Sequence, residues 1–149
     1  MEILGRMVNA SNSTLVVVDD DKQFIYKPIS GERPLWDFPE GTLAFRERAA
    51  YVLSELGNWN VVPKTVLREG PLGLGSFQDW VDADVTDVDV LEPNNIPDGW
   101  REVFRGVDET GSQVVLAHAD KPQLRAIALF DAVANNADRK GGHLLTAEN

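Results

Sequence analysis

The order of apolar runs and turns near the start of the chain constrains the fold most. Short apolar segments at 2–9, 14–18 and 24–28 are separated by the polar turns ASNS and DDDKQ. This pattern predicts three short antiparallel strands. The third strand, FIYKP, ends at Pro28, and a loop with glycine and proline punctuation follows at 29–41. We therefore expect the chain to begin with a three-stranded meander.

One helix is predicted next, over TLAFRERAAYVLSELG. Thr42 is placed to cap its start and Gly57 to end it. An apolar stripe at helical spacing is formed by Phe45, Ala49, Val52 and Leu56. The other side is small and apolar apart from Glu47, so we expect both sides to be covered. A carboxylate in such a place needs a cationic partner.

The rest of the chain predicts two more strands, a linker and a second helix. The strands are expected in VVPKTVLREG (61–70) and PLGLGSFQDWVD (71–82). Residues 82–98 are acidic and predict weak structure, whereas WREVFRGVDETGSQVVL carries both helix and hairpin signals and leaves the choice open. Asp120 and Pro122 precede LRAIALFDAVANN, a helix apolar almost all round and expected to be buried at a domain centre.

This layout predicts an α+β fold with two parts. Residues 1–82 form a β-rich part, and residues 83–149 form a mostly helical part. At 149 residues the chain is long enough to bury a core.

Composition excludes several classes of function. There are no cysteines, so disulfides, thiolate metal sites and thiol nucleophiles are ruled out. The net charge of −10 argues against nucleic acid and anionic membranes as partners. No apolar run approaches the length of a membrane span, and we expect a cytoplasmic protein. The acidic runs at 19–21 and 79–109 are interpreted as solvated surface. No GxSxG, HExxH or GxxxxGK[ST] pattern occurs, so a hydrolase has little support and a P-loop is excluded.

Lys27 and Glu47 are the first candidates for chemistry. A strand lysine is most often an edge or surface charge. Alternatively, Lys27 points into a cleft, holds phosphate oxygens and pairs with Glu47 on the next helix. The turn formed by Ser11, Asn12 and Ser13 offers backbone N–H groups and hydroxyls to a phosphate, although most such turns are only turns.

The segment NNADRKGGHLL is the second candidate. Asp138 is placed to accept a proton from a hydroxyl, and Arg139 or Lys140 to offset phosphate charge. His143 is a candidate metal ligand. The alternative is a helix end with favourable cations and glycine stops. His118 has no comparable setting and is interpreted as structural.

The order of Lys27, Glu47 and Asp138, together with the loop ADRKGGHLL, resembles the phosphatidylinositol 3-/4-kinase-like and HipA-like branch of the protein-kinase-like fold. Three longer blocks are similar to a family of bacterial proteins assigned to that branch: YKPISGERPLWDFPEGTLAFRERAAY, VVPKTVLREGPLGLGS and FDAVANNADRKGGHLL. The resemblance implies a two-lobe fold, with a small antiparallel-sheet lobe carrying one helix and an incomplete helical lobe that contains the catalytic loop.

The resemblance also implies roles for single residues. Lys27 would bind phosphate with Glu47 as its partner, and Asp138 would be the catalytic-loop aspartate, with Arg139 and Lys140 beside it. The adenine ring of ATP would lie against a hinge formed by Gln78, Trp80 and Val81. The turn Ser11, Asn12 and Ser13 would replace a glycine-rich loop.

Two departures from the family pattern bear on activity. His143 stands where the branch usually has a metal-binding Asn, although Mg²⁺ or Mn²⁺ is the expected ion. The chain ends at LLTAEN, before the second metal-binding Asp that this fold normally supplies. We therefore expect an ATP-dependent phosphotransferase acting on a protein or small-molecule hydroxyl, incomplete in this chain. The alternative is a non-catalytic, pseudokinase-like module that binds a protein partner, with a homodimer formed through its incomplete lower lobe.

Overall fold

The computed structural model describes residues 1–7, 12–83 and 86–146. The chain divides into two compact units, Met1–Trp80 and Val81–Asn149. Both units combine antiparallel sheet with one α-helix, so the chain has an α+β fold. No helix among the described residues is long and apolar enough to cross a membrane.

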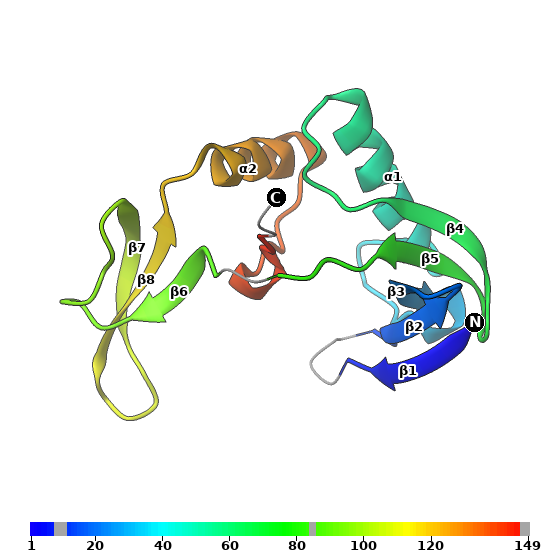
Figure 1. The fold of residues 1–149 in the computed structure, drawn as a ribbon, viewed down its shortest axis with the longest axis horizontal. Coiled ribbons are helices and arrows are strands. Elements are labelled where there is room, and N and C mark those ends of the chain that lie inside the picture. Colours follow the sequence, from blue (N-terminus) through cyan, green and yellow to red (C-terminus); the bar gives the residue numbers. More distant parts are fainter. Residues whose placement is uncertain (8–11, 84–85, 147–149) are drawn as a thin grey trace. The chain divides into compact units, whose positions relative to one another are not determined.

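The first unit is a five-stranded antiparallel sheet with the strand order β1-β2-β3-β5-β4 (Figure 1). The predicted meander and the two later strands are present, with shifted ends. The elements are β1 (Glu2–Arg6), β2 (Leu15–Asp19), β3 (Lys22–Pro28), η1 (Ile29–Gly31), α1 (Leu43–Leu56), β4 (Thr65–Gly70) and β5 (Gly73–Asp79).

The turn between β2 and β3 is shorter than predicted. Asp20 and Asp21 have φ angles of 48° and 63°, and Asp19 pairs directly with Lys22. Two consecutive left-handed residues make the tight hairpin turn that matches strand twist, and Asp tolerates this conformation. Lys22 and Gln23 consequently belong to β3 and not to the turn.

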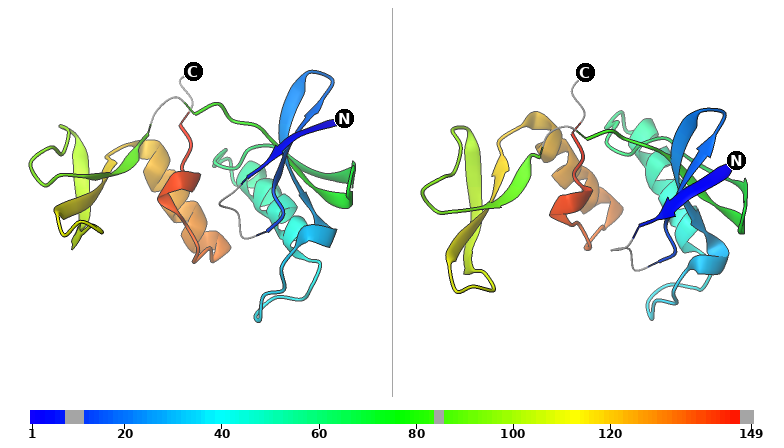
Figure 2. Two further views of the ribbon diagram at one scale, coloured as in Figure 1. Left: turned by 90° about the horizontal axis from the view of Figure 1, so that it is seen from below. Right: turned by 60° about the horizontal axis from the view of Figure 1, so that its bottom comes forward.

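The two faces of the first sheet carry different residues: one carries the buried core, and the other carries Lys27 and faces α1. One face carries the buried core of Leu15, Val17, Tyr26 and Phe77, in which the last two rings stack with centroids 4.4 Å apart. Lys27 follows Tyr26 in β3 and therefore lies on the opposite face. Helix α1 contacts β4 and β5 on that opposite face, as Figure 2 shows. The sheet thus presents Lys27 toward the helix.

The C-terminal end of α1 is held by a side chain, whereas the expected side-chain cap at its start does not form. Gly57 ends the helix as predicted. The fully buried Ser54 accepts hydrogen bonds from the N–H groups of Val61 and Val62, at 2.9 and 3.3 Å, and so holds the chain that leaves the helix. The prediction that the Thr42 side chain caps the start is wrong, because its hydroxyl donates to the carbonyl of Pro39 instead.

The second unit contains a three-stranded antiparallel sheet with the order β6-β8-β7. Its elements are β6 (Val88–Leu91), β7 (Trp100–Val107), β8 (Gln113–Ala119), α2 (Pro122–Ala134) and η2 (Gly141–His143). The expectation of a mostly helical second part is wrong. The ambiguous segment is a hairpin whose turn is held by Asp108, which accepts N–H groups from Thr110 and Ser112. In β8, buried and less buried residues alternate, as in a strand with one covered face.

Helix α2 is less buried than its composition predicts. Pro122 occupies its first turn as expected, but Phe130 is its one fully buried residue, and Leu129 and Val133 are more than half exposed. An apolar helix becomes buried only when other elements cover each of its sides. In the described part of the second unit, one small sheet and one short 3-10 helix do not enclose it.

Asp87 contradicts the interpretation of the acidic runs as uniformly solvated. It is buried just before β6, where Lys121 Nζ lies 2.7 Å and Thr146 Oγ1 2.6 Å from its carboxylate oxygens. Burial alone would raise the pKa of Asp87, but the hydrogen bonds from Lys121 and Thr146 outweigh burial and lower it. The carboxylate thereby joins the start of β6, the start of α2 and the segment after η2.

Candidate functional site

Three polar side chains converge between the first sheet and α1. Lys27 Nζ lies 2.5 Å from Glu47 Oε1, and Ser76 Oγ donates to Glu47 Oε2, also at 2.5 Å. Lys27 and Ser76 are direct cross-strand partners in β3 and β5. One carboxylate from the helix therefore holds a cation with one oxygen and a hydroxyl with the other.

The burial of this cluster matters for its chemistry. Ser76 is fully buried, whereas the side chains of Lys27 and Glu47 are 30% and 29% exposed. An ion pair that is partly in contact with water does not carry the full desolvation cost of a buried pair. Its cation stays accessible, and the carboxylate fixes its position.

Apolar side chains lie on the same face of the sheet as Lys27. Ile25 precedes Lys27 by two residues in β3, and Val16 of β2 is the cross-strand partner of Ile25. Both are half-buried, and α1 packs against β4 and β5, on the other side of β3 in the sheet order. A small apolar area therefore adjoins the Lys27 ammonium group.

The predicted hinge residues lie at the end of β5 and just after it. Gln78 is the cross-strand partner of Ile25, and its amide donates to Thr65 Oγ1 at 3.2 Å. Trp80 closes the first unit, and its N–H donates to the carbonyl of Gln23. Val81 begins the second unit.

The predicted phosphate-binding turn is described in part. Ser11 lies outside the described residues, whereas Asn12 and Ser13 lie within them. Asn12 Oδ1 accepts the N–H of Arg33 at 2.9 Å, and the N–H of Ser13 donates to the carbonyl of Gly31 at 3.1 Å. Both residues therefore attach this turn to the end of η1 and the residues that follow it.

In the second unit, the segment after α2 is anchored at both ends. Asn135 ends the helix in the left-handed conformation, with φ 53°. The Arg139 guanidinium donates two hydrogen bonds, of 2.8 and 2.7 Å, to the Asp131 carboxylate. At the far end, Thr146 is bound to Asp87. In both views of Figure 2 the chain reverses after α2 and returns along it.

The ion pair with Arg139 makes Asp131 a structural anchor. Hydrogen bonds from Arg139 lower the pKa of Asp131, although burial acts in the opposite direction, and the same pairing raises the pKa of Arg139. The sequence predicted that Arg139 offsets phosphate charge. In the structure its guanidinium is engaged with Asp131, which positions the loop.

Asp138 is the exposed point of this anchored loop. Its side chain is 84% exposed, and Lys140 Nζ lies 3.5 Å from Asp138 Oδ2. His143 ends η2, whose Gly141 packs against Val88 of β6. Within residues 1–7, 12–83 and 86–146, no group of three or more His, Asp or Glu side chains could hold a metal ion. The role of His143 as a metal ligand stays a prediction.

Three residues that organise these sites were not identified from the sequence. Ser76 is a small residue in a glycine-rich strand, and its contact with Glu47 depends on the β3–β5 register. Asp131 lies in a helix and Asp87 in an acidic linker, where carboxylates are usually solvated. For Asp131 a signal was available. Asp131 and Arg139 lie eight residues apart across the end of α2, and this spacing allows an ion pair at the helix end.

The chain is similar in sequence to a mycobacterial protein. The chain is 46% identical over 160 residues to protein Rv2133c of Mycobacterium tuberculosis, a match that covers 97% of this chain. It covers 58% of the relative, so the chain spans little more than half of that protein's length. No protein-family model matches the chain, and neither does any solved structure.

Proposed function

We propose that this chain is the nucleotide-binding part of a kinase-like phosphotransferase with a protein-kinase-like two-lobe fold, related to the phosphatidylinositol 3-/4-kinase-like and HipA-like branch. The observation that carries the proposal is the contact of Lys27 with Glu47, next to a small apolar area of the same sheet. A fixed cation beside apolar side chains suits a ligand that joins phosphates to a planar base.

Each residue of the cluster has a distinct task in this proposal. Lys27 binds phosphate oxygens of ATP as a point charge. Glu47 holds the ammonium group in place, and Ser76 fixes the second oxygen of Glu47 so that the carboxylate does not rotate. Val16 and Ile25 offer an apolar surface to the base, and Asn12 and Ser13 lie in a turn that would cover the phosphates.

Asp138 is the proposed base of the transfer step. It would accept the proton of a hydroxyl on a protein or a small molecule while that oxygen attacks the γ-phosphorus and the bond from phosphorus to the β–γ bridging oxygen breaks. Its high exposure fits a group that meets a second substrate. Lys140, also exposed, would offset charge on the transferred group.

The expected metal ion would bind together with the nucleotide. Among the described residues, no group of three or more His, Asp or Glu side chains could hold it. Mg²⁺ or Mn²⁺ would enter with the phosphate oxygens of ATP as ligands, which is common for Mg²⁺.

The test is nucleotide binding by wild type and two lysine variants. ATP with Mg²⁺ or Mn²⁺ should raise the melting temperature, because a ligand at about 100 times its Kd stabilises by about 2.7 kcal/mol. Lys27→Met should abolish the shift. Lys22→Met is the matched control, since Lys22 lies in the same strand and pairs with Asp79. The proposal fails if wild type shows no shift, and the role of Lys27 fails if Lys27→Met responds like wild type.

Transfer itself is tested with γ-labelled ATP and Asp138→Asn. The variant should bind ATP as wild type does and transfer no label. If wild type binds ATP but transfers none, the chain is a binding module only. Equal transfer by wild type and Asp138→Asn would remove Asp138 from the mechanism.

A second candidate function is a non-catalytic module that binds a protein partner, in the first place a second copy of the chain. The exposed apolar side chains of the second unit favour it: Val103, Phe104, Leu129 and Val133 are each more than half exposed. Light scattering should then give a dimer mass that Leu129→Lys with Val133→Lys reduces to a monomer. A monomer mass for wild type at all concentrations would count against it.

A further inference from the structure

The loop before α1 makes a long-range contact with the start of that helix. The Glu32 carboxylate accepts hydrogen bonds from the N–H groups of Leu43 and Ala44, at 3.1 and 2.8 Å. The first N–H groups of a helix have no partner within the helix. Thr42, at the capping position, makes no such side-chain bond. Glu32 therefore caps α1 from outside the helix, and its negative charge also suits this helix end.

The residues on both sides of Glu32 are bound to a different element. The carbonyl of Gly31 accepts the N–H of Ser13, and the N–H of Arg33 donates to Asn12 Oδ1. A Cβ added to Gly31 would lie 2.4 Å from the Cβ of Ser13, so the two segments are in close contact. Gly31 and Arg33 thus bind the Asn12–Ser13 turn, and Glu32 between them binds α1.

Glu47 lies one helical turn beyond this cap. Ala44 is almost fully buried, and Glu47 follows it by three residues, so both lie on the same side of α1. Farther along, Arg48 donates to the carbonyl of Thr65 and Ser54 binds Val61. These contacts hold the later turns of α1 to the rest of the first unit, whereas Glu32 holds its first turn to the Asn12–Ser13 turn.

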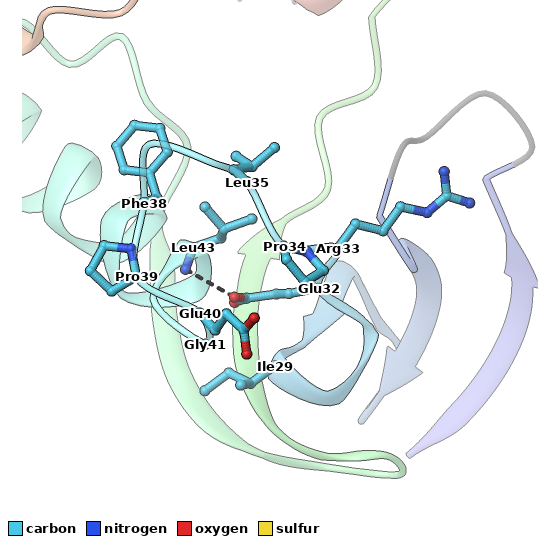
Figure 3. A pocket seen from close by; sticks show the side chains of 10 residues that line it. All are labelled: Ile29, Glu32, Arg33, Pro34, Leu35, Phe38, Pro39, Glu40, Gly41 and Leu43. Atoms are coloured by element: carbon cyan, nitrogen blue, oxygen red, sulfur yellow. Dashed lines mark hydrogen bonds between the residues drawn. The ribbon is translucent and has the colours of Figure 1, made fainter.

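Figure 3 shows Glu32 directed toward Leu43, with the loop 33–42 arching over a cavity of about 140 Å³. Charged and apolar side chains both line this cavity, and Glu32, Arg33 and Glu40 are among them (Figure 3). Both oxygens of Glu32 accept N–H groups of α1. The Glu32 carboxylate, although it lines the cavity, is therefore engaged with the helix.

We propose that Glu32 is a positioning residue that couples the Asn12–Ser13 turn to the Lys27–Glu47 pair through the first turn of α1. The coupling rests on the proposed function, because it links the segment expected over the phosphates to the lysine expected to bind them. A ligand that binds the Asn12–Ser13 turn thereby also restrains the helix that holds Glu47. Loss of the Glu32 contacts releases the first turn of α1 and weakens the hold of Glu47 on Lys27.

The first test needs no nucleotide. The acylation rate of single lysines is measured by mass spectrometry on the folded chain, since a lysine that loses its ion pair reacts faster. Glu32→Ala should raise the rate at Lys27 about fivefold or more, the effect of losing a helix cap. Lys22 should keep its rate. Glu32→Gln, which retains one carbonyl oxygen, should give a smaller rise, and Glu40→Ala in the same loop should give none.

A second variant separates positioning from general loosening. In a Glu47→Gln background the Lys27 ion pair is already lost, so Glu32→Ala should add nothing to the Lys27 rate. An equal increase in both backgrounds would overturn the proposal, and so would an unchanged Lys27 rate in Glu32→Ala. If Glu32→Ala does not fold, the comparison of Glu32→Gln with Glu40→Gln decides in the same way.

The nucleotide arm distinguishes this proposal from the proposed function. If wild type binds ATP, Glu32→Ala should weaken binding about fivefold while Glu40→Ala leaves it unchanged. Unchanged affinity in Glu32→Ala would overturn the coupling. If wild type binds no ATP, the proposed function fails, and the Lys27 acylation rates still decide whether Glu32 positions Glu47.

Discussion

Gly75 is the position where the smallest change should disturb the site most. It lies in β5 opposite Pro28, and an added Cβ would lie 2.4 Å from the carbonyl oxygen of Lys27 and 2.8 Å from the Cα of Pro28. Atoms in comfortable contact are about 3.5–4.0 Å apart. These two obstructing atoms belong to the backbone and do not rotate away, and Cε2 of the buried Tyr26 lies 2.7 Å from the added Cβ as well. Gly75→Ala must therefore push β3 and β5 apart by about 1 Å at Lys27.

The expected cost of Gly75→Ala is about 3 kcal/mol, at the upper end of the range for overpacked interiors. Urea unfolding followed by circular dichroism measures it as a lower midpoint with an unchanged slope. Gly5→Ala in β1 is the matched control, because nothing lies within 4 Å of its added Cβ. It should leave stability unchanged or raise it by up to about 1 kcal/mol. Equal stability of Gly75→Ala and wild type would refute the steric argument.

Three further results are expected. Ser54→Ala should lower the free energy of unfolding by about 1–3 kcal/mol, because two part-buried N–H groups lose their acceptor; urea unfolding measures it. Asp131→Asn should lower the melting temperature most near pH 7. The pKa of Asp131 is lowered in the folded state, so its ion pair stabilises above the unfolded pKa of about 3.9 and is lost as pH falls through the lowered value. Asp120, which accepts hydrogen bonds from Arg101 and Arg125, should titrate with a pKa of about 2 in carboxyl NMR spectra.

The strands and the α-helix of the first unit could be predicted because their signals are local. Alternating apolar residues, turn residues and a glycine at the helix end each specify their own segment. The expectation that both sides of α1 are covered is wrong, because Phe45 and Leu56 of its apolar stripe are 47% and 80% exposed. The start of α1 could not be predicted in this way. Thr42 is a good capping residue by type, but the cap is Glu32, and the long-range fold decides which of them reaches the helix.

The second unit was predicted less well, because its decisive contacts are not local. The sequence pattern of α2 predicts an apolar helix, but it does not indicate whether other elements cover that helix. Leu129 remains exposed because they do not. Asp87 lies among acidic residues that normally face water, and only the folded chain brings Lys121 and Thr146 to it. For the candidate site, the sequence indicated that Lys27 and Glu47 belong together, and it gave no sign of Ser76.

The two anchors of the segment after α2 have a mechanical consequence for Asp138. Asp131 holds the chain immediately after this residue through Arg139, and Asp87 holds it again at Thr146. The backbone of the loop therefore has little freedom to travel, and the reach of the carboxylate is limited to rotation about its own two side-chain bonds. Under the proposed function, the substrate hydroxyl therefore has to approach the Asp138 carboxylate, because the loop that carries this carboxylate is held in place.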